Sequence, residues 1–479
     1  MTDLLLVNPL YLKDDPVEQR LMTPYFPLGL LYLAATARQA GYDVSIYDAM
    51  FQTSDEAFIA TLERERPKVV GIGILSTVRA AALRLADLAH RQGAKVIVGG
   101  ADPTGRPASY LDHRSNGDWP IDVVVVGEGE QTLLELLPIL LADAPAGGRL
   151  AGVNGLAYRH GDAQVMMTPE RSHCPDLDSL PLPARDLIDV EAYRRAWQDR
   201  HGLFSLSIIA TRGCPYGCKW CQKSVFGRSF RPRSAEAVAE ELRAIKDRYH
   251  PDQIRIVDDV MGIDRKWVRD WHDAVLERDA VIPFECLSRV DLMDEELVRL
   301  LKEAGCVRIA FGAESGSQRV LDAMNKGTQV GQIRRAAELC RRFGIEIYYY
   351  IMLGYPGEEW ADICKTVEFL KETRPDMFSS TIAYPLPGTD FYDEVKHRLL
   401  DMPDWDYTAE NRLLFQREYS TRFYQWVQRW LHQEWHGARL RQGEERASFP
   451  ERIRRLGGRW ATRGMVEFFR LTDRGGDAS

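Results

Sequence analysis

The 479-residue sequence contains 45% hydrophobic and 28% charged residues, an ordinary composition for a globular protein. Its formal net charge of −8 gives no whole-chain reason to expect nucleic-acid binding. No apolar run reaches the ~18 residues of a spanning helix, and 8 cysteines are too few for a disulfide framework. We therefore expect a reduced, cytoplasmic protein of two or three domains.

The first 145 residues alternate short β-rich runs with helical ones. This alternation predicts an α/β domain with an open, doubly wound, Rossmann-like parallel sheet. The expected strands are Leu4 to Val7, Val44 to Tyr47, Val69 to Leu75, Val96 to Val98 and Val123 to Val126. The expected helices are Leu28 to Ala40, Ser54 to Arg66, Arg79 to Gln92 and Thr132 to Leu141.

The carboxyl ends of these strands carry glycine and small polar residues. Ligands of doubly wound sheets bind beyond those ends, and glycines there let the backbone approach a flat ligand closely. No GxGxxG sequence follows the first strand, which disfavours a generic nucleotide site without excluding it. The strand ends are Asn8-Pro9, Ser76-Thr77, Gly99-Gly100 and Gly127-Glu128-Gly129-Glu130.

Residues 146–200 show weak periodicity and four prolines, Pro169, Pro175, Pro181 and Pro183. Proline-rich joints mark a boundary or a semi-rigid connector. We therefore expect a first domain over residues 1–145 and a linker over residues 146–200.

From Leu203 a second α/β series begins, and polar or glycine residues follow each of its strands. The series predicts a full or partial barrel over residues 201–400, whose chemistry lies at the carboxyl strand ends. The expected strands are Phe204 to Ala210, Gln253 to Val257, Phe284 to Leu287, Arg308 to Phe311, Glu346 to Leu353 and Met377 to Ala383. The expected helices are 234–249, 265–278, 294–304, 317–323, 330–343 and 359–372.

Three cysteines follow the first strand of this series in the run Thr-Arg-Gly-Cys-Pro-Tyr-Gly-Cys-Lys-Trp-Cys. Thiolates hold iron–sulfur clusters, so Cys214, Cys218 and Cys221 could hold a four-iron cluster with one iron left open for reaction. The alternative is a structural zinc site, which needs a fourth ligand. That ligand would be His201 or one of the scattered cysteines, Cys174, Cys286, Cys306, Cys340 and Cys364.

Several further motifs occur in order along the chain: Gly-Ala-Glu-Ser-Gly-Ser with Lys326-Gly327 after it, Gly-Tyr-Pro-Gly-Glu and Pro-Leu-Pro-Gly-Thr. With the cysteine motif, they make residues 1 to about 400 resemble the cobalamin-binding radical S-adenosylmethionine (SAM) enzymes, class B methyltransferases included. The resemblance implies a partial (β/α)6 TIM-type barrel, a [4Fe-4S] cluster, SAM chelated to its open iron, and cobalamin.

The resemblance also implies roles for individual residues. Cys214, Cys218 and Cys221 would hold the cluster, and no catalytic side chain is assigned. The residues expected near SAM are Trp220, Asp258, Asp259, Arg289, Glu314, Ser315, Leu353 and Gly354. The residues expected near cobalamin are Asn8, Ser76, Thr77, Gly99, Gly100, Asp102, Gly127, Glu128 and Gly129.

Some of these residues have a structural alternative. Asp258 and Asp259 could cap a helix N-terminus, and Arg289 could simply pair with Asp291. Glu314 needs a partner, because an unpaired buried carboxylate is costly.

The corrinoid assignment departs from the methionine-synthase pattern, because the sequence has no DxHxxG motif. Asp112-His113 is contiguous, and Gly99-Gly100-Ala101-Asp102-Pro103 stands where relatives often have Gly-Gly-Pro-His. No lower histidine ligand to cobalt is therefore expected.

The resemblance implies reductive cleavage of SAM to a 5′-deoxyadenosyl radical and methylation of an unactivated carbon of a small molecule or lipid in biosynthesis. The alternatives are radical ring closure, ring contraction or another rearrangement, a non-catalytic corrinoid-binding or electron-transfer protein, and methylthiolation. The last usually needs a further cluster, for which the leftover cysteines are too scattered. The expected electron donor is a flavodoxin or ferredoxin.

The last residues, 401–479, predict a helical C-terminal region rich in arginine and tryptophan and without lysine from Arg422 to Arg474. Basic helices with aromatic residues can lie on an anionic membrane surface, or bind nucleic acid. The alternative is a helical cap whose arginines are solvated or paired.

Overall fold

The computed structural model describes residues 2–142, 147–161, 164–400, 415–444 and 449–472. Two compact units account for the described residues. The first comprises residues up to 215 and 222–255, and the second comprises 216–221 and the residues from 256 onward, so the boundary passes through the cysteine loop.

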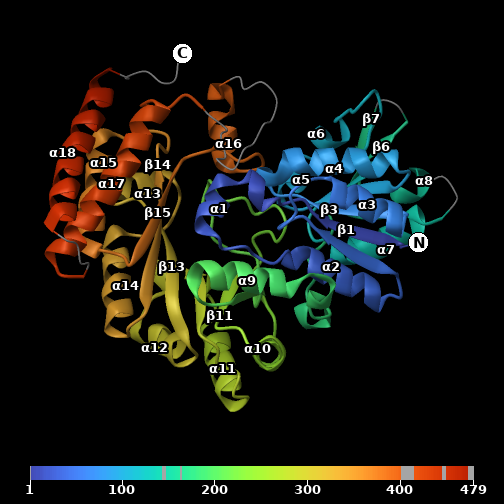
Figure 1. The fold of residues 1–479 in the computed structure, drawn as a ribbon, viewed down its shortest axis with the longest axis horizontal. Helices are drawn as coiled ribbons and strands as arrows, with labels where there is room; N and C mark the ends of the chain where they lie inside the picture. The colour runs from blue at the N-terminus through green and yellow to red at the C-terminus, as the bar shows by residue number, and fades with distance from the viewer. Residues whose placement is uncertain (1, 143–146, 162–163, 401–414, 445–448, 473–479) are drawn as a thin grey trace. The chain divides into compact units, whose positions relative to one another are not determined.

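The first unit contains a seven-stranded sheet of order β2-β1-β3-β4-β5-β6-β7 (Figure 1). Strands β1 to β5 pair with one another in parallel, and the strand order reverses between β1 and β3, where doubly wound sheets bind ligands. The strands are β1 (Leu4–Asn8), β2 (Val44–Asp48), β3 (Val69–Gly73), β4 (Lys95–Gly99), β5 (Val123–Val125), β6 (Leu156–His160) and β7 (Gln164–Met167).

Helices cover both faces of this sheet, as expected from its buried, aliphatic strands. Leucines of α2 and α7 share one core cluster with alternate strand residues such as Leu6 and Ile97, and α4 contacts β3 and β4. The helices of this unit are α1 (Pro16–Leu21), α2 (Leu28–Gln39), α3 (Glu56–Glu65), α4 (Arg79–Arg91), α5 (Ala101–Gly105), α6 (Pro107–Leu111), α7 (Glu130–Leu140), α8 (Gly147–Leu150), α9 (Val190–His201) and α10 (Ala235–Tyr249).

The structure differs from the sequence prediction in the expected linker. Strands β6 and β7 lie within residues 146–200 and extend the sheet as an antiparallel hairpin. The buried run Leu156 to Tyr158 pairs with β5, and the proline series begins only after β7. The prolines therefore follow the sheet and do not mark its end at residue 145, and the predicted domain limits stay a prediction.

A second sheet has six strands in the order β15-β14-β13-β12-β11-β8. This sequential order and the parallel pairing of β12 to β15 give the open, partial barrel that the sequence predicts. The strands are β8 (Ser205–Ile208), β11 (Gln253–Met261), β12 (Phe284–Ser288), β13 (Cys306–Glu314), β14 (Glu346–Leu353) and β15 (Met377–Ile382). A short antiparallel ladder of β9 (Thr211–Arg212) and β10 (Arg231–Pro232) brackets the cysteine loop.

Helices of the second unit cover one face of its sheet. Tyr349 of β14 is fully buried and stacks on Phe369 of α15 at 5.6 Å between ring centres, whereas Tyr350, on the opposite face, is 38% exposed. The helices are α11 (Arg265–Glu277), α12 (Glu295–Glu303), α13 (Gln318–Ala323), α14 (Val330–Arg342), α15 (Trp360–Thr373), α16 (Asp390–Val395), α17 (Thr421–Arg441) and α18 (Phe449–Thr472).

The predicted C-terminal helical region contains the paired helices α17 and α18. Residues 401–414, 445–448 and 473–479 of that region lie outside the described residues. A search of the described helices finds none that is both long and apolar enough to cross a membrane.

Gly316 gives a test of the packing of the second unit. A Cβ atom there would lie 2.6 Å from the Lys365 carbonyl oxygen and 2.7 Å from Thr366 Cα. Because backbone cannot yield as a side-chain tip can, we expect Gly316→Ala to lower the free energy of unfolding by about 1–3 kcal/mol in urea titrations. Gly331→Ala is the control, since Gly331 lies in α14 and an added Cβ atom there would meet no atom within 4 Å. An equal effect of both substitutions would contradict this packing.

Candidate functional site

The cysteine loop leaves the first unit after β9. Gly213 has φ +84, and a Cβ atom there would lie 2.0 Å from the Ser229 carbonyl oxygen, so only glycine fits at this entry. Of the three cysteines, Cys214 is buried, Cys218 half-buried and Cys221 exposed. Further along, Gly217 accepts a hydrogen bond from the side-chain amide of Asn325 at 2.8 Å.

The donor set of this loop fits a four-iron cluster. Within the described ranges, three or more His, Cys, Asp or Glu side chains nowhere converge on the position of one metal ion. Ligands of a four-iron cluster bind different irons, so they need not converge on a single point. The loop offers three thiols, the side-chain type that binds such clusters.

Arg289 lies beside this loop in the second unit. Its Nη1 is 3.9 Å from the Cys218 sulfur, and its guanidinium is 3.6 Å from the centre of the Tyr216 ring. A positive charge there suits an anionic thiolate-bound cluster, whose potential depends on hydrogen bonds to sulfur.

The structure shows the ion pair that the sequence offered as the alternative role of Arg289. Arg289 forms the alternative ion pair with Asp291, through bonds of 3.0 and 3.1 Å, and it also donates to the Lys326 carbonyl at 2.9 Å. Most of its donors are therefore occupied within the protein. Its contact with SAM stays a prediction.

Glu314 has the partner that its burial requires. Its carboxylate accepts a hydrogen bond from Lys326 Nζ at 3.1 Å, and both side chains are less than one-tenth exposed. Lys326 Nζ also lies 5.0 Å from the centre of the Trp220 ring. The structure thus brings together Trp220, Glu314 and Lys326. Arg289 joins them through its hydrogen bond to the Lys326 carbonyl.

The sequence predicts that Asp258 and Asp259 follow a strand or cap a helix. Both predictions are wrong. The two residues lie inside β11, which runs to Met261, and Asp264 caps the following helix instead. Since neighbouring strand residues point to opposite faces, Asp258 is buried while Asp259 is exposed. The two carboxylates therefore cannot hold the same ligand atom.

The remaining residues expected near SAM lie at or directly after strand ends. Ser315 is fully buried, and its hydroxyl bonds with Thr366 and accepts from the Ser317 backbone N–H, so its place near SAM stays a prediction. Leu353 ends β14 with no exposed surface. Gly354 follows with φ +73, in the left-handed region that favours glycine.

A cavity of about 310 Å³ lies at the carboxyl ends of the strands in the first unit. It lies at the point where the strand order reverses, because the ends of β1 and β3 both line it. Apolar side chains and glycines form most of its wall. Gly71 and Gly73 are close-packed there, since a Cβ atom would lie 2.8 Å from Leu6 and 3.0 Å from Leu30. Such a wall fits a flat, largely apolar group such as part of a corrinoid.

The cavity brings together some of the residues expected near cobalamin and not others. Asn8, Gly99, Gly100, Gly127, Glu128 and Gly129 line it, whereas Ser76, Thr77 and Asp102 do not. Asp102 is buried with Arg106 and Tyr110 as its partners. Glu128 has its carboxylate occupied by two arginines, so it is not free to bind a ligand.

Sequence reasoning missed Arg212, Arg231 and the role of Lys326. Arg212 and Arg231 pair with Glu128, and Arg212 also lines the cavity. Arg212 stands two residues before Cys214, which is a usable signal, but its partner lies 84 residues away in the chain. Nothing in a single sequence connects positions so distant.

The chain thus has a Rossmann-like sheet with a glycine-walled cavity, a three-cysteine loop and an open barrel sheet. These features are typical of enzymes that combine an iron–sulfur loop with a Rossmann-like cofactor unit. Two family models match these parts: the B12 binding domain over residues 20–137 and the radical SAM superfamily over residues 208–370. The chain belongs to the cobalamin-binding radical SAM family.

Individual proteins support this assignment. The chain is 31% identical over 404 residues to an uncharacterized methyltransferase of Pyrococcus horikoshii, which covers 82% of both chains. It is 27% identical to an anaerobic magnesium-protoporphyrin IX monomethyl ester cyclase of Rubrivivax gelatinosus, over 77% of this chain and 66% of that one. Its fold is similar to that of the radical SAM methyltransferase TsrM from Kitasatospora setae, with a TM-score of 0.67, 20% identity and coverage of 83% and 75%.

These findings confirm the predicted fold class and the predicted cofactors. The protein is a radical SAM enzyme whose cofactors are a [4Fe-4S] cluster, SAM and cobalamin. The individual ligand residues stay predictions.

Glu358, beside Gly354, gives a test of the electrostatics of this loop. Burial raises its pKa to about 8, although the Gly354 N–H donates to its carboxylate at 2.6 Å. A carboxyl whose pKa is raised by folding contributes most stability below its ordinary pKa of 4.5, and it loses this contribution as the pH rises to about 8.

We therefore expect Glu358→Gln, which keeps an acceptor for Gly354, to gain stability relative to the parent as the pH rises from 6 to 8. The shift should be about 2–3 kcal/mol in the free energy of unfolding of the iron-free protein. Glu338→Gln, at an exposed position of α14, is the control. A pH-independent difference between Glu358→Gln and the parent would show that Glu358 is ionised throughout.

Proposed function

We propose that the protein methylates a carbon atom of a small molecule or lipid. The observation that carries the proposal is the lining of the corrinoid cavity. Ile209 and Arg212, before the three cysteines, and Val225 and Phe226, after them, line the cavity together with the strand ends. A corrinoid held there lies next to the loop that carries Cys214. Methyl transfer to a carbon radical requires such proximity of the two cofactors.

Each cofactor has a defined contribution. When bound, the cluster with SAM would supply the radical chemistry that removes hydrogen from an unactivated carbon, and cobalamin would supply the methyl group. The residues of the chain hold and orient these groups. We assign cluster binding to Cys214, Cys218 and Cys221.

The residues that we propose around SAM lie in the second unit. Buried Glu314 and Lys326 contact the half-buried Trp220, and Arg289 is bonded to the Lys326 carbonyl. We propose that SAM lies against this group, with Leu353 and Gly354 near the adenine. Of the two aspartates, Asp259 has the exposed position that a ligand contact needs. We therefore retain Asp259 as a SAM contact and omit Asp258.

A second candidate function is radical ring closure. It is favoured by the similarity to the Rubrivivax cyclase, because the same cofactors can serve either reaction. The products differ in mass: methylation adds a carbon from SAM, whereas ring closure adds none and removes two hydrogens.

The proposal includes a cytoplasmic location, a flavodoxin or ferredoxin as electron donor and a peripheral membrane contact through the C-terminal helices. For the last, Trp460, Phe468 and Leu471 of α18 are 79%, 54% and 66% exposed. The paired-cap alternative also has support, because Arg459 bonds to Glu434 and Arg470 to Glu467.

The cluster assignment predicts the result of Cys218→Ala. The variant should lose most of the roughly four irons per chain of reconstituted protein and cleave no SAM, while remaining folded by circular dichroism. Cys364→Ala, at a half-buried position of α15, should keep both properties. Normal iron content and SAM cleavage in Cys218→Ala would refute the assignment.

The methylation proposal predicts the fate of the SAM methyl group. Reconstituted enzyme with cobalamin, reductant and an organic extract of the source cells should convert a metabolite into a product 14 mass units heavier with ordinary SAM, and 17 units heavier with SAM whose methyl carries deuterium. High-resolution mass spectrometry measures both. A product two mass units lighter, identical with either SAM, would instead establish ring closure, and SAM cleavage with neither product would leave a radical SAM enzyme of another reaction.

A further inference from the structure

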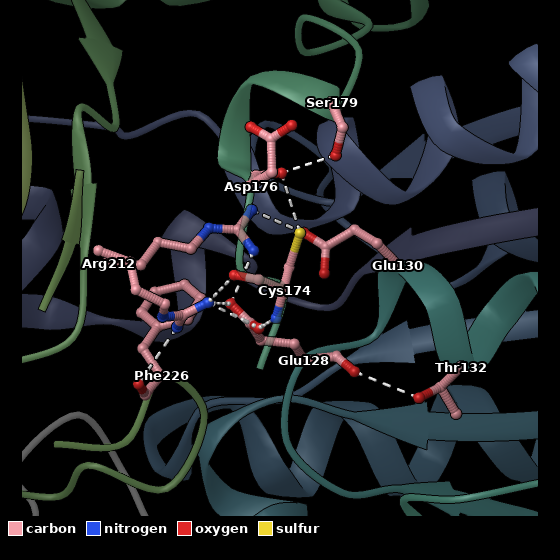
Figure 2. A network of polar contacts seen from close by, with 9 residues as sticks. Glu128, Glu130, Thr132, Cys174, Asp176, Ser179, Arg212 and Phe226 are labelled. Carbon is pink, nitrogen blue, oxygen red and sulfur yellow. Dashed lines mark hydrogen bonds and ion pairs between the residues drawn. The ribbon is translucent and has the colours of Figure 1, made fainter. Parts of the chain in front are cut away.

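The Glu128 carboxylate is the centre of a buried polar network in the first unit (Figure 2). It accepts hydrogen bonds from Arg212 Nη1 at 3.0 Å, from Arg231 Nη1 at 3.0 Å to each oxygen, and from the Cys174 backbone N–H at 2.7 Å. The side chain is 5% exposed. Both carboxylate oxygens are therefore used by the protein.

Arg212 extends the network to Glu130. Its Nη2 donates to Glu130 Oε1 at 2.7 Å, and its guanidinium lies 5.3 and 5.0 Å from the ring centres of Tyr32 and Phe226. Burial lowers the pKa of Arg212, but Glu130 and Glu128 together raise it above its ordinary value. Two carboxylates thus balance two guanidiniums in a site nearly closed to water.

The two arginines stand at the two ends of the cysteine loop. Arg212 in β9 and Arg231 in β10 are directly paired across the short antiparallel ladder, and all three cysteines lie in the sequence between them. Arg231 also donates to the carbonyls of Cys174 at 2.7 Å and Phe226 at 3.3 Å. One carboxylate, Glu128, therefore fixes both ends of the loop that carries the predicted cluster ligands.

The same carboxylate belongs to the wall of the corrinoid cavity. Glu128, Glu130, Arg212 and Phe226 all line it, next to Gly127 and Gly129. A group that enters the cavity contacts the residues that hold the cysteine loop.

We propose that Glu128, Arg212 and Arg231 are positioning residues that couple the two cofactor sites, so that cobalamin binding and cluster assembly stabilise each other. The three residues, which we name the Glu128 clamp, touch neither the cluster nor SAM in this role. They act by holding the loop in one geometry against the cavity wall. The inference rests on the proposed cluster-binding role of the three cysteines.

The physical basis is thermodynamic linkage. If the assembled cluster fixes the loop, and the loop fixes Arg212 and Glu128 in the cavity wall, then cobalamin no longer has to order that wall on binding. The same free energy must appear as greater stability of the cluster when cobalamin is bound. Charge-assisted hydrogen bonds in a buried site have the strength and direction to transmit such a constraint.

The experiment measures hydroxocobalamin affinity by anaerobic equilibrium dialysis, with cluster-reconstituted and with iron-free full-length protein. We expect the reconstituted protein to bind about 5- to 150-fold more tightly. Cluster loss to an iron chelator should slow in the presence of hydroxocobalamin, as reciprocity requires. Equal affinities of the two forms of the parent protein would overturn the proposal without any variant.

Glu128→Gln tests the clamp itself, since glutamine keeps the shape but removes the charge. We expect the ratio of the two affinities to fall to about one. A merely structural role would instead weaken both forms equally and leave the ratio unchanged, which would overturn the proposal. Glu135→Gln is the matched control: Glu135 lies on α7, which begins two residues after Glu128, and it pairs with Arg171 outside the cavity wall, so this variant should keep the parent ratio.

If Glu128→Gln fails to fold by circular dichroism, Arg231→Lys replaces it. Lysine keeps the positive charge but cannot reach Glu128 and two carbonyls with a planar fork, so the affinity ratio should fall, and an unchanged ratio would overturn the proposal. These outcomes differ from failure of the proposed function. Absence of iron in the reconstituted parent would refute the cysteine assignment, and absence of a methylated product would refute methylation, whatever the affinity ratio.

Discussion

The arrangement of the first unit depends on one buried charge balance. Glu128 and Glu130 come from the turn after β5, and Arg212 and Arg231 come from the two short strands around the cysteine loop. Removing one member of such a group leaves an uncompensated buried charge, which typically costs about 3–5 kcal/mol. Loop and sheet are therefore held together by a constraint that hydrophobic packing would not supply at a ligand-binding edge, where glycines replace large side chains.

The sequence was sufficient to predict most of the regular structure. The strands of both parallel series are largely apolar runs bounded by glycine or polar residues, so local pattern and tertiary environment agree. The hairpin of β6 and β7 was the exception, because the buried part of β6 is only the run from Leu156 to Tyr158 and its partner strand β5 lies before two helices in the sequence. A three-residue signal next to a proline series does not distinguish a strand from a linker.

The candidate site was less predictable, because its contacts join residues far apart in the sequence. The cysteine spacing alone indicated an iron–sulfur loop, but the partners of Glu128, Glu314 and Arg289 follow from the fold. Asp258 and Asp259 show that a local sequence pattern can also suggest a shared site that the fold does not form. An adjacent acidic pair resembles a binding motif in a sequence, yet the alternation of a strand sends its two side chains to opposite faces, and only the observed length of β11 shows this.

The Gly312-Ala313-Glu314 segment shows how the site determines its own residues. Glu314 has φ +59, a left-handed conformation that few non-glycine residues adopt, and strain of this kind persists only where surrounding contacts fix it. The buried ion pair with Lys326 is such a contact. A Cβ atom at Gly312 would lie 2.5 Å from the Glu314 carboxylate and 2.6 Å from Lys326 Nζ. The ion pair with Lys326 therefore fixes the strained backbone of Glu314, and it leaves room only for glycine at position 312.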